Sequence, residues 1–351
     1  MARLRRVDCS GPGIRRRRRG KGFEYFDEDG RRVTEPSVIE RIRGLAIPPA
    51  WDEVWICPYP FGHIQATGTD AAGRKQYRYH DRWRERRDRE KFESMEQFAR
   101  ALPRLRRRVE RDLARGGMPR ERVLGCGARL LDRGFFRIGS EDYAEENDTY
   151  GIATMQKRHV TVSGDEVTFD YEAKGGQRRV QVIGDPAVAE IVRTLKRRRG
   201  GTDDLLAYKN GRRWVDVKSD DINEYVKEAA GGDFSSKDFR TWSGTVLAAV
   251  ALAVSGMAAV SRTSRKRAKT RAVKEVARYL GNTPAVCRAS YIDPRVFDRF
   301  DGGVTIGGVL PELIEDTGPW PDVQGAVEEA VLDLIEDDRS SDALETVPRA
   351  A

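Results

Sequence analysis

Hydrophobic and polar positions alternate over short distances in the first part of the chain. From Phe23 the pattern predicts a strand, a tight turn at Asp29-Gly30 and a second strand. Two further apolar runs, at 54–56 and 63–66, are short, and prolines between them disfavour helices. We therefore predict a small β-rich domain over residues 23–85.

A helical pattern follows this part. Residues 86–91 are all charged, and we expect them to link two domains. Beyond them, apolar residues recur at helical spacing with arginines on the opposite face, as in an amphipathic helix. The residues of this apolar stripe are Phe98, Leu102, Leu105, Val109 and Leu113. We expect a second, mainly helical domain over 92–308. Its further helical segments are predicted at 186–198, 220–230, 240–260 and 266–280.

One β-type segment interrupts the helical domain. Three short runs rich in β-branched and aromatic residues lie between His159 and Val182, separated by turns at Gly164-Asp165 and at 174–176. This pattern predicts a three-stranded meander that presents Lys174 at the tip of its second turn. The predicted fold class is therefore α+β, with a small β-rich N-terminal domain and a larger, mainly α-helical domain that contains a three-stranded β meander.

Charge is distributed very unevenly along the chain. The formal net charge is +8, but residues 312–351 contain 12 acidic and two basic side chains, a net of −10. The rest of the chain therefore carries +18, which is typical of a protein that binds a polyanion. Of the 64 basic residues 51 are arginines, whose planar guanidinium groups suit bidentate phosphate contacts. A coding bias toward arginine would explain this ratio but not the net charge, so nucleic acid is the predicted partner.

Both ends of the chain have biased composition. Residues 1–22 form a basic arm with five consecutive arginines, Arg15 to Arg19. This arm is interpreted as a flexible, solvated segment or as one that contacts DNA directly. Residues 309–351 are interpreted as an acidic, partly disordered tail, with an amphipathic helix as a candidate at 326–334.

Several classes of protein are disfavoured by the sequence. The four cysteines are far apart and the three histidines lack metal-ligand spacing, so a zinc site is not expected. The N-terminus lacks the apolar segment of a secretory signal, and the 15-residue apolar run at 246–260 is too short for a membrane span and indicates a buried helix. The nearest match to a phosphate-binding loop, at 68–75, has Arg74 where lysine is required, so nucleotide binding is not expected. We expect a cytoplasmic, nucleoid-associated protein that binds neither membranes nor nucleotides.

Five residues stand in contexts suited to phosphate chemistry. Arg137 lies in an apolar frame, Lys174 on a hairpin tip and Arg240 at the start of the most apolar helix. Asn282 follows a helix end, and Tyr291 comes nine residues later. Each residue alone has a structural explanation, such as an ion pair, a helix cap or a core tyrosine. Their occurrence together is what favours a catalytic site.

This set of residues and its order resemble the type IB DNA topoisomerases, in particular their short bacterial and poxvirus-like branch. The likeness extends from about Gly20 to Gly303. It rests on LAIPPAW at 45–51, GHIQA at 62–66, GRKQYRYH at 73–80, Arg137-Ile-Gly, Lys174 on its hairpin, KDFRTW at 237–242 and Ser290-Tyr291. The resemblance implies a helical catalytic domain of the tyrosine recombinase and topoisomerase IB type, which forms a clamp around duplex DNA with the N-terminal domain.

The resemblance also implies a mechanism. Tyr291 would attack the scissile phosphorus and form a 3′-phosphotyrosyl enzyme, while Arg137 and Arg240 stabilise the charge that develops on the phosphate oxygens. Lys174 would act as the general acid that protonates the departing 5′-oxygen. Religation would then need no ATP, metal or other cofactor, and rotation between the two steps would relax supercoils.

Position 282 departs from the wider family pattern. Many members have histidine nine residues before the tyrosine, and this chain has Asn282. An amide can donate a hydrogen bond to a phosphate oxygen, but it cannot carry a proton charge. We therefore expect Asn282 to stabilise the transition state through hydrogen bonding and not to act as an acid or base.

The resemblance places DNA-binding residues in both domains. Arg74 and Gln76 would reach base edges in the major groove, and Tyr77 and Tyr79 would touch the backbone. Tyr143 matches a further phosphate-contacting position. The alternation of basic and aromatic residues at 74–79 agrees with this interpretation, although an exposed β-strand would look similar.

Two other functions are compatible with parts of this pattern. Tyrosine site-specific recombinases share the nucleophile and its cationic helpers, but they carry a helical domain where this chain has a β-rich one. A non-enzymatic DNA-binding protein with a degenerate site would not need chemically competent residues at all five positions. We therefore predict a monomeric DNA topoisomerase of type IB that acts on double-stranded DNA.

Overall fold

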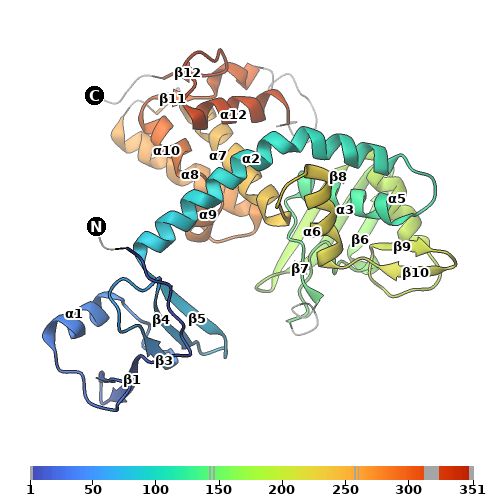
Figure 1. The fold of residues 1–351 in the computed structure, drawn as a ribbon. Helices are drawn as coiled ribbons and strands as arrows, with labels where there is room; N and C mark the ends of the chain where they lie inside the picture. Colours follow the sequence, from blue (N-terminus) through green and yellow to red (C-terminus); the bar gives the residue numbers. More distant parts are fainter. Residues whose placement is uncertain are drawn as a thin grey trace. The chain divides into compact units, whose positions relative to one another are not determined.

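The computed structural model describes residues 3–141, 144, 147–256, 258–259, 261–311 and 324–347. The chain divides into two compact units, Met1–Lys91 and Phe92–Ala351 (Figure 1). The first unit is rich in β-strands, and the larger second unit is mainly helical with a small sheet. The predicted α+β fold class is therefore confirmed.

The boundary between the two units falls inside a helix. α2, Asp81–Leu113, passes through residues 86–91, so the segment predicted to link the two domains is helical, and it ends where the two units divide. Arg86 and Arg87 both contact Glu90, at the i,i+4 and i,i+3 spacings that bring side chains together on a helix. The charged run is the solvated surface of this helix, and the predicted apolar stripe further along is its buried face.

The N-terminal unit is built on one antiparallel sheet of five strands in the order β2-β1-β3-β4-β5. The strands are β1 Ile14–Arg19, β2 Gly22–Phe26, β3 Asp52–Ile56, β4 Ile64–Thr69 and β5 Lys75–Tyr79. One helix of this unit, α1 Pro36–Gly44, was not predicted; it begins at a proline, the residue favoured at a first helical position. Ile42 of this helix packs with Ile14, Val54 and Ile56 in a small core.

The arginine run at the N-terminus belongs to the sheet. Residues 15–19 lie in β1, between β2 and β3, so the prediction of a flexible arm over 1–22 is wrong. The guanidinium carbon of Arg16 lies 4.1 Å from the centroid of the Phe23 ring, and its Nη2 donates to the carbonyl of Pro48 at 3.1 Å. An arginine stem can cover apolar surface while its charge stays near solvent, so arginines can occupy strand positions normally held by apolar residues.

The first hairpin of this unit also differs from the prediction. β1 and β2 are joined through Gly20, whose φ of 55° lies in the left-handed region that glycine adopts without strain. The turn predicted at Asp29-Gly30 exists, but beyond β2 the chain forms only an isolated bridge between Phe26 and Arg32. The aromatic run at 23–26 is therefore the second strand of the first hairpin and not its first strand.

The second unit contains the predicted helices and several short strands. The helices beyond α2 are α3 Arg120–Gly134, α5 Pro186–Arg197, α6 Ser219–Ala230, α7 Ser236–Gly256, α8 Arg262–Leu280, α9 Pro284–Ser290, α10 Pro294–Asp301 and α12 Ala326–Glu336. Short 3₁₀ turns lie at Lys157–His159 and Gly307–Val309. The strands are β6 Val160–Ser163, β7 Glu166–Ala173, β8 Gln177–Gly184, β9 Ala207–Asn210, β10 Arg213–Asp216, β11 Val304–Thr305 and β12 Glu345–Thr346. The four predicted helical segments correspond to α5, α6, α7 and α8.

α7 lies in the core of the second unit. Its buried side chains include Phe239, Trp242 and Leu252, and it contacts α3, α8, α10 and α12. Among the described residues, no helix has the length and hydrophobicity that crossing a membrane requires. Residues 246–256 of the apolar run therefore belong to a buried helix, as the length of the run predicts.

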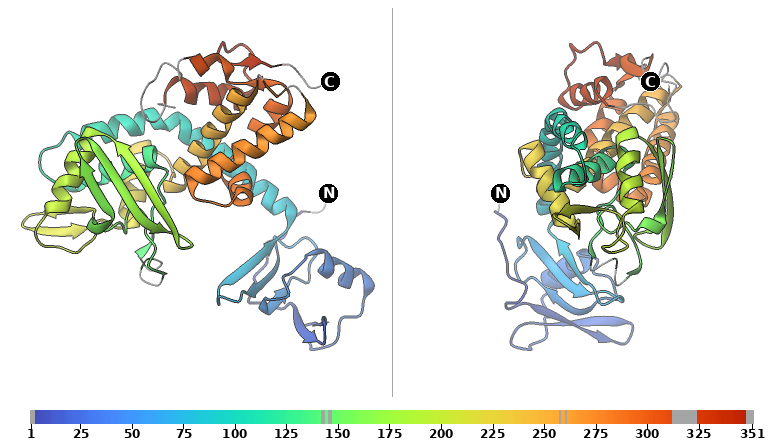
Figure 2. Two further views of the ribbon diagram at one scale, coloured as in Figure 1. Left: turned by 180° about the vertical axis from the view of Figure 1, so that it is seen from behind. Right: turned by 90° about the vertical axis from the view of Figure 1, so that its right-hand side faces the viewer.

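The predicted three-stranded meander is confirmed. Its strand order is β6-β7-β8, and β7 and β8 pair in continuous register from Glu166 with Gly184 to Ala173 with Gln177. Lys174 lies in the turn that joins them and is exposed. Both views in Figure 2 show this long hairpin as part of the same sheet as β6.

The described part of the C-terminal tail is folded. α12 buries Val327, Val331 and Leu334 against the helical core, and β12 pairs with β11. Figure 1 shows these elements gathered beside α10. The helix predicted at 326–334 is therefore confirmed, while the interpretation of 309–351 as partly disordered is wrong for residues 324–347. The other part of that prediction, residues 312–323 and 348–351, lies outside the described residues.

Candidate active site

The candidate site is built around the C-terminal end of α8. The helix ends at Gly281, whose φ of 60° gives the left-handed cap that glycine favours. Carbonyl groups at a helix C-terminus lack intrahelical donors and carry partial negative charge. Here they accept hydrogen bonds from arginines of α7, of β8 and of the segment after α3, so one helix end gathers several guanidinium groups.

Arg240 is the most deeply buried of these arginines. It comes from the first turns of α7, is 4% exposed, and donates to the carbonyls of Phe135 at 2.6 Å and Leu280 at 2.7 Å. Phe135 has a left-handed φ of 55° at the end of α3. Burial lowers the pKa of Arg240, although an arginine remains cationic at neutral pH. Among the described residues its Nε has no hydrogen-bond partner.

Arg137 and Asn282 contact each other directly. Nη2 of Arg137 donates to the carbonyl of Gly281 at 2.9 Å and to Oδ1 of Asn282 at 2.5 Å. The Nδ2 of Asn282 is buried and has no partner among the described residues. The amide therefore has its oxygen fixed by a cation and its donor group unused, which suits it to bind an anion.

Tyr291 lies at the end of α9, next to Arg240. The guanidinium carbon of Arg240 is 5.2 Å from the centroid of the Tyr291 ring. The backbone of Tyr291 crosses α7 very closely at Gly244, where a Cβ atom would lie 2.5 Å from the Tyr291 carbonyl oxygen. A side chain at position 244 would displace this backbone, so glycine is required for the tyrosine to occupy its present position.

The structure thus brings together four of the five predicted catalytic residues. Arg137, Arg240, Asn282 and Tyr291 are joined by the contacts described above. Lys174, the fifth, lies in the turn of the β7–β8 hairpin, and Tyr171 and Arg179 of the two strands pair two positions before the end of the ladder. The hairpin turn is exposed, as expected of a group that must meet a bound strand.

A third arginine, Arg179, lines one cavity together with Arg137 and Arg240, and it was not predicted as a site residue. The cavity is lined by Phe135, Arg137, Tyr150, Tyr171, Ala173, Arg179, Arg240, Leu280 and Gly281. Burial raises the pKa of Tyr171 to about 12, and its hydroxyl donates to Gln181 at 2.8 Å. Arg179 follows the ordinary strand pattern of 177–184, so its place beside the predicted catalytic residues could not be foreseen from the sequence.

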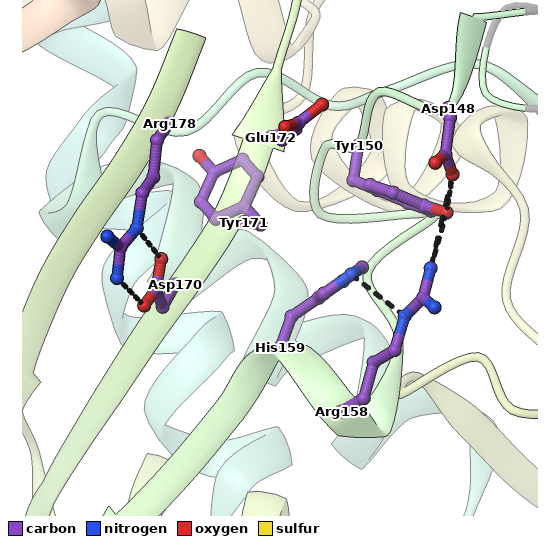
Figure 3. Close-up of a pocket in the computed structure, with 8 residues that line it drawn as sticks. All are labelled: Asp148, Tyr150, Arg158, His159, Asp170, Tyr171, Glu172 and Arg178. Carbon is purple, nitrogen blue, oxygen red and sulfur yellow. Dashed lines mark hydrogen bonds and ion pairs between the residues drawn. The ribbon is translucent and has the colours of Figure 1, made fainter. Parts of the chain in front are cut away.

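A second depression, of about 330 Å³, lies on the other side of Tyr150 and Tyr171 (Figure 3). Its charged groups are largely paired with each other. Arg178 forms two hydrogen bonds with Asp170, at 2.8 and 2.6 Å, and Arg158 donates to the hydroxyl of Tyr150 at 3.0 Å. Burial lowers the pKa of His159, whose ring lies against Tyr150. Figure 3 shows the two members of each pair facing one another. The arginines of this depression therefore have side-chain partners within it, whereas the other cavity is lined by Arg137, Arg179 and Arg240.

The predicted DNA-binding residues of the first unit lie on and beside β5. Arg74 and Gln76 both donate to the Oδ2 of Asp70, at 3.1 and 2.9 Å. Tyr77 and Tyr79 are exposed on one face of β5, with ring centroids 6.0 Å apart. The sequence analysis missed Asp70, which holds the two polar side chains together. Tyr143, predicted to contact phosphate, lies outside the described residues.

Comparisons with known proteins agree with this arrangement. Residues 80–300 match the family model of the catalytic core of eukaryotic DNA topoisomerase I, and residues 22–70 match that of the N-terminal domain of bacterial DNA topoisomerase IB. The chain is 32% identical over 294 residues to DNA topoisomerase 1B of Acanthamoeba polyphaga mimivirus, an alignment that covers 80% of this chain and 85% of the relative. The chain therefore belongs to the type IB DNA topoisomerase family and is an isomerase that acts on DNA. These matches do not favour a recombinase or a non-enzymatic DNA-binding protein.

Proposed function

We propose that this protein relaxes supercoiled duplex DNA through a 3′-phosphotyrosyl intermediate formed on Tyr291. The observation that carries the proposal is the convergence of Arg137, Arg240 and Asn282 beside this tyrosine. A phenol with a pKa near 10 is a weak nucleophile at neutral pH, so it requires surroundings that stabilise negative charge. Two guanidinium groups and an amide donor provide such surroundings.

The unused donors of the site suggest how the phosphate is held. Nε of Arg240 and Nδ2 of Asn282 are buried without partners among the described residues, and leaving buried donors unpaired is costly. We assign them to the non-bridging oxygens of the scissile phosphate, together with Arg137. As the bond from phosphorus to Tyr291 forms, the phenol proton passes to water, charge grows on these oxygens and the hydrogen bonds become stronger.

Lys174 is assigned as the general acid. As the bond between phosphorus and the 5′-oxygen breaks, a proton passes from the lysine ammonium to that oxygen and a 5′-hydroxyl leaves. The phosphotyrosine retains the energy of the phosphodiester, so the 5′-hydroxyl can reverse the reaction without ATP, a bound nucleotide or a metal cofactor. Between the two steps the free end rotates and supercoils are lost.

The first unit is proposed to hold the duplex through Arg74, Gln76, Tyr77 and Tyr79. Two exposed tyrosines and two polar side chains at one edge of a sheet suit contacts with backbone and bases. We further propose that the protein acts as a monomer on the nucleoid in the cytoplasm. One chain supplies the whole catalytic set, so a partner subunit is not needed to complete it.

Plasmid relaxation in EDTA tests this function. The wild-type monomer should relax a supercoiled plasmid without ATP and without forming recombinant products. Tyr291→Phe should bind duplex DNA with unchanged affinity but form no covalent adduct, because the phenylalanine ring has no hydroxyl to attack phosphorus. Residual nicking by this variant would show that another residue is the nucleophile. Recombinant products from the wild type would favour a recombinase.

A further inference from the structure

Arg179 lines the same cavity as Arg137 and Arg240, but it binds different carbonyl groups at the end of α8. It comes from β8, opposite Tyr171 of β7. Its Nη1 donates to the carbonyl of Arg278 at 2.7 Å and its Nη2 to that of Tyr279 at 2.5 Å. The next two carbonyls along the chain, those of residues 280 and 281, are held by the two catalytic arginines. Three guanidinium groups therefore bind four successive carbonyls at the end of α8.

The contacts of Arg179 connect the hairpin to the catalytic residues. β8 is an edge strand of its sheet, and among the described residues no strand pairs with its outer side. The ladder ends at the pair of Ala173 and Gln177, roughly 7 Å of strand beyond Arg179, and the turn with Lys174 follows. Farther from the turn, Gln181 donates to the carbonyl of Gly134. Along β8, Arg179 is therefore closer to the turn with Lys174 than Gln181 is.

The chemistry of this contact favours a fixed arrangement. A planar guanidinium group that donates to two carbonyls is held in both position and orientation. The helix C-terminus carries partial negative charge, which attracts a cation. Burial and, to a smaller degree, the charge of Arg137 lower the pKa of Arg179. The side chain is thus partly removed from water and held by the same helix end as the catalytic arginines.

We propose that Arg179 is a positioning residue that anchors the β7–β8 hairpin to the end of α8 and so places Lys174 at the departing 5′-oxygen. This inference rests on the proposed role of Lys174 as general acid. It gives Arg179 no direct contact with the phosphate. The competing explanation, that Arg179 is a third phosphate-binding cation, predicts a different dependence on the leaving group.

A substrate with sulfur in place of the 5′-bridging oxygen separates the two explanations. A thiolate departs without a proton, so cleavage of the sulfur substrate does not depend on the general acid. Under single-turnover conditions, Arg179→Ala should slow cleavage of the oxygen substrate by about 10- to 100-fold, the range expected for a misplaced catalytic group. Its rate on the sulfur substrate should equal that of the wild type.

Arg178→Ala is the matched control. Arg178 is the adjacent residue of β8, but it is exposed and bound to Asp170 outside the catalytic cavity. This variant should cleave both substrates at wild-type rates. Arg179→Lys keeps a cation with hydrogen-bond donors, so it should show the same selective defect to a smaller extent. It serves as the test variant if Arg179→Ala does not fold, as judged by thermal unfolding.

The outcomes distinguish failure of this inference from failure of the proposed function. If Lys174→Ala is not rescued by the sulfur substrate, the general-acid role itself is wrong. If Lys174→Ala is rescued but the Arg179 variant is equally slow on both substrates, Arg179 acts on the phosphate or on overall structure and the inference is overturned. Wild-type rates on both substrates would also overturn it.

Discussion

At the scale of single residues, the site depends on how closely backbones approach as much as on the charged groups. Arg137 and Arg240 could be predicted because arginines in apolar surroundings need a specific partner. Arg179 could not, because only the tertiary structure brings its strand to the end of α8. The need for glycine at position 244 could not be predicted either, because it arises from the carbonyl of Tyr291, 47 positions later.

Gly244→Ala tests the importance of that approach. The added Cβ would lie 2.5 Å from the carbonyl oxygen of Tyr291, so the tyrosine must shift relative to Arg240. We expect single-turnover cleavage to slow by about 100-fold, with duplex affinity unchanged. Gly127→Ala on α3 is the control, because its Cβ would meet Ile222 at an ordinary contact distance of 3.4 Å. Equal rates for the two variants would show that the position of Tyr291 tolerates this displacement.

At the scale of elements, prediction succeeded where one face of an element is apolar. The periodicity of α5 and the alternation in β7 identify them directly, because their buried residues are hydrophobic. β1 was missed because its five arginines show no such alternation, and the guanidinium groups of two of them lie over aromatic rings of β2. The helical conformation of the charged run at 86–91 could not be predicted, because a fully solvated helix surface and an irregular linker have the same composition.

One buried carboxylate links α2 to α6 and makes the stability of the second unit depend on pH. Asp112 accepts hydrogen bonds from Arg108, Arg115 and the hydroxyl of Tyr225. Burial alone would raise the pKa of Asp112, but these hydrogen bonds together lower it. The carboxylate therefore stabilises the fold above the pKa of about 3.9 that an unfolded aspartate has. This contribution is lost as the pH falls through the lower pKa of the folded state.

Asp112→Asn should remove this dependence. At pH 7 we expect the free energy of unfolding in urea to fall by about 1–3 kcal/mol, because the charged hydrogen bonds are lost. The difference from the wild type should shrink as the pH is lowered below about 4. Asp233→Asn, which removes an exposed ion pair with Lys227, should have little effect at any pH. A constant difference between Asp112→Asn and the wild type at all pH values would show that the carboxylate charge is unimportant.

At the scale of the whole molecule, acidic residues of the C-terminal tail form ion pairs with arginines of the rest of the chain. Glu328 of α12 pairs with Arg106 of α2 and accepts a hydrogen bond from Trp242 at 2.7 Å, two positions from Arg240 on α7. Glu336 pairs with Arg100. The acidic residues of α12 therefore fasten the tail to the helices around the active site, an arrangement that net charge alone could not reveal.

Two variants separate this structural use from competition with DNA. Deleting residues 324–351 removes α12 and its buried apolar face, so it should lower the thermal unfolding temperature and slow cleavage. The double variant Glu329→Gln/Asp342→Asn removes two exposed charges and leaves the buried residues in place, so it should unfold like the wild type. If the tail instead competed with DNA for the basic surface, the deletion would leave the unfolding temperature unchanged and tighten duplex binding at low salt. Binding isotherms at several salt concentrations, with thermal unfolding of the same samples, distinguish the structural role of the tail from competition with DNA. Removing the tail lowers the unfolding temperature only if the tail is folded against the helices.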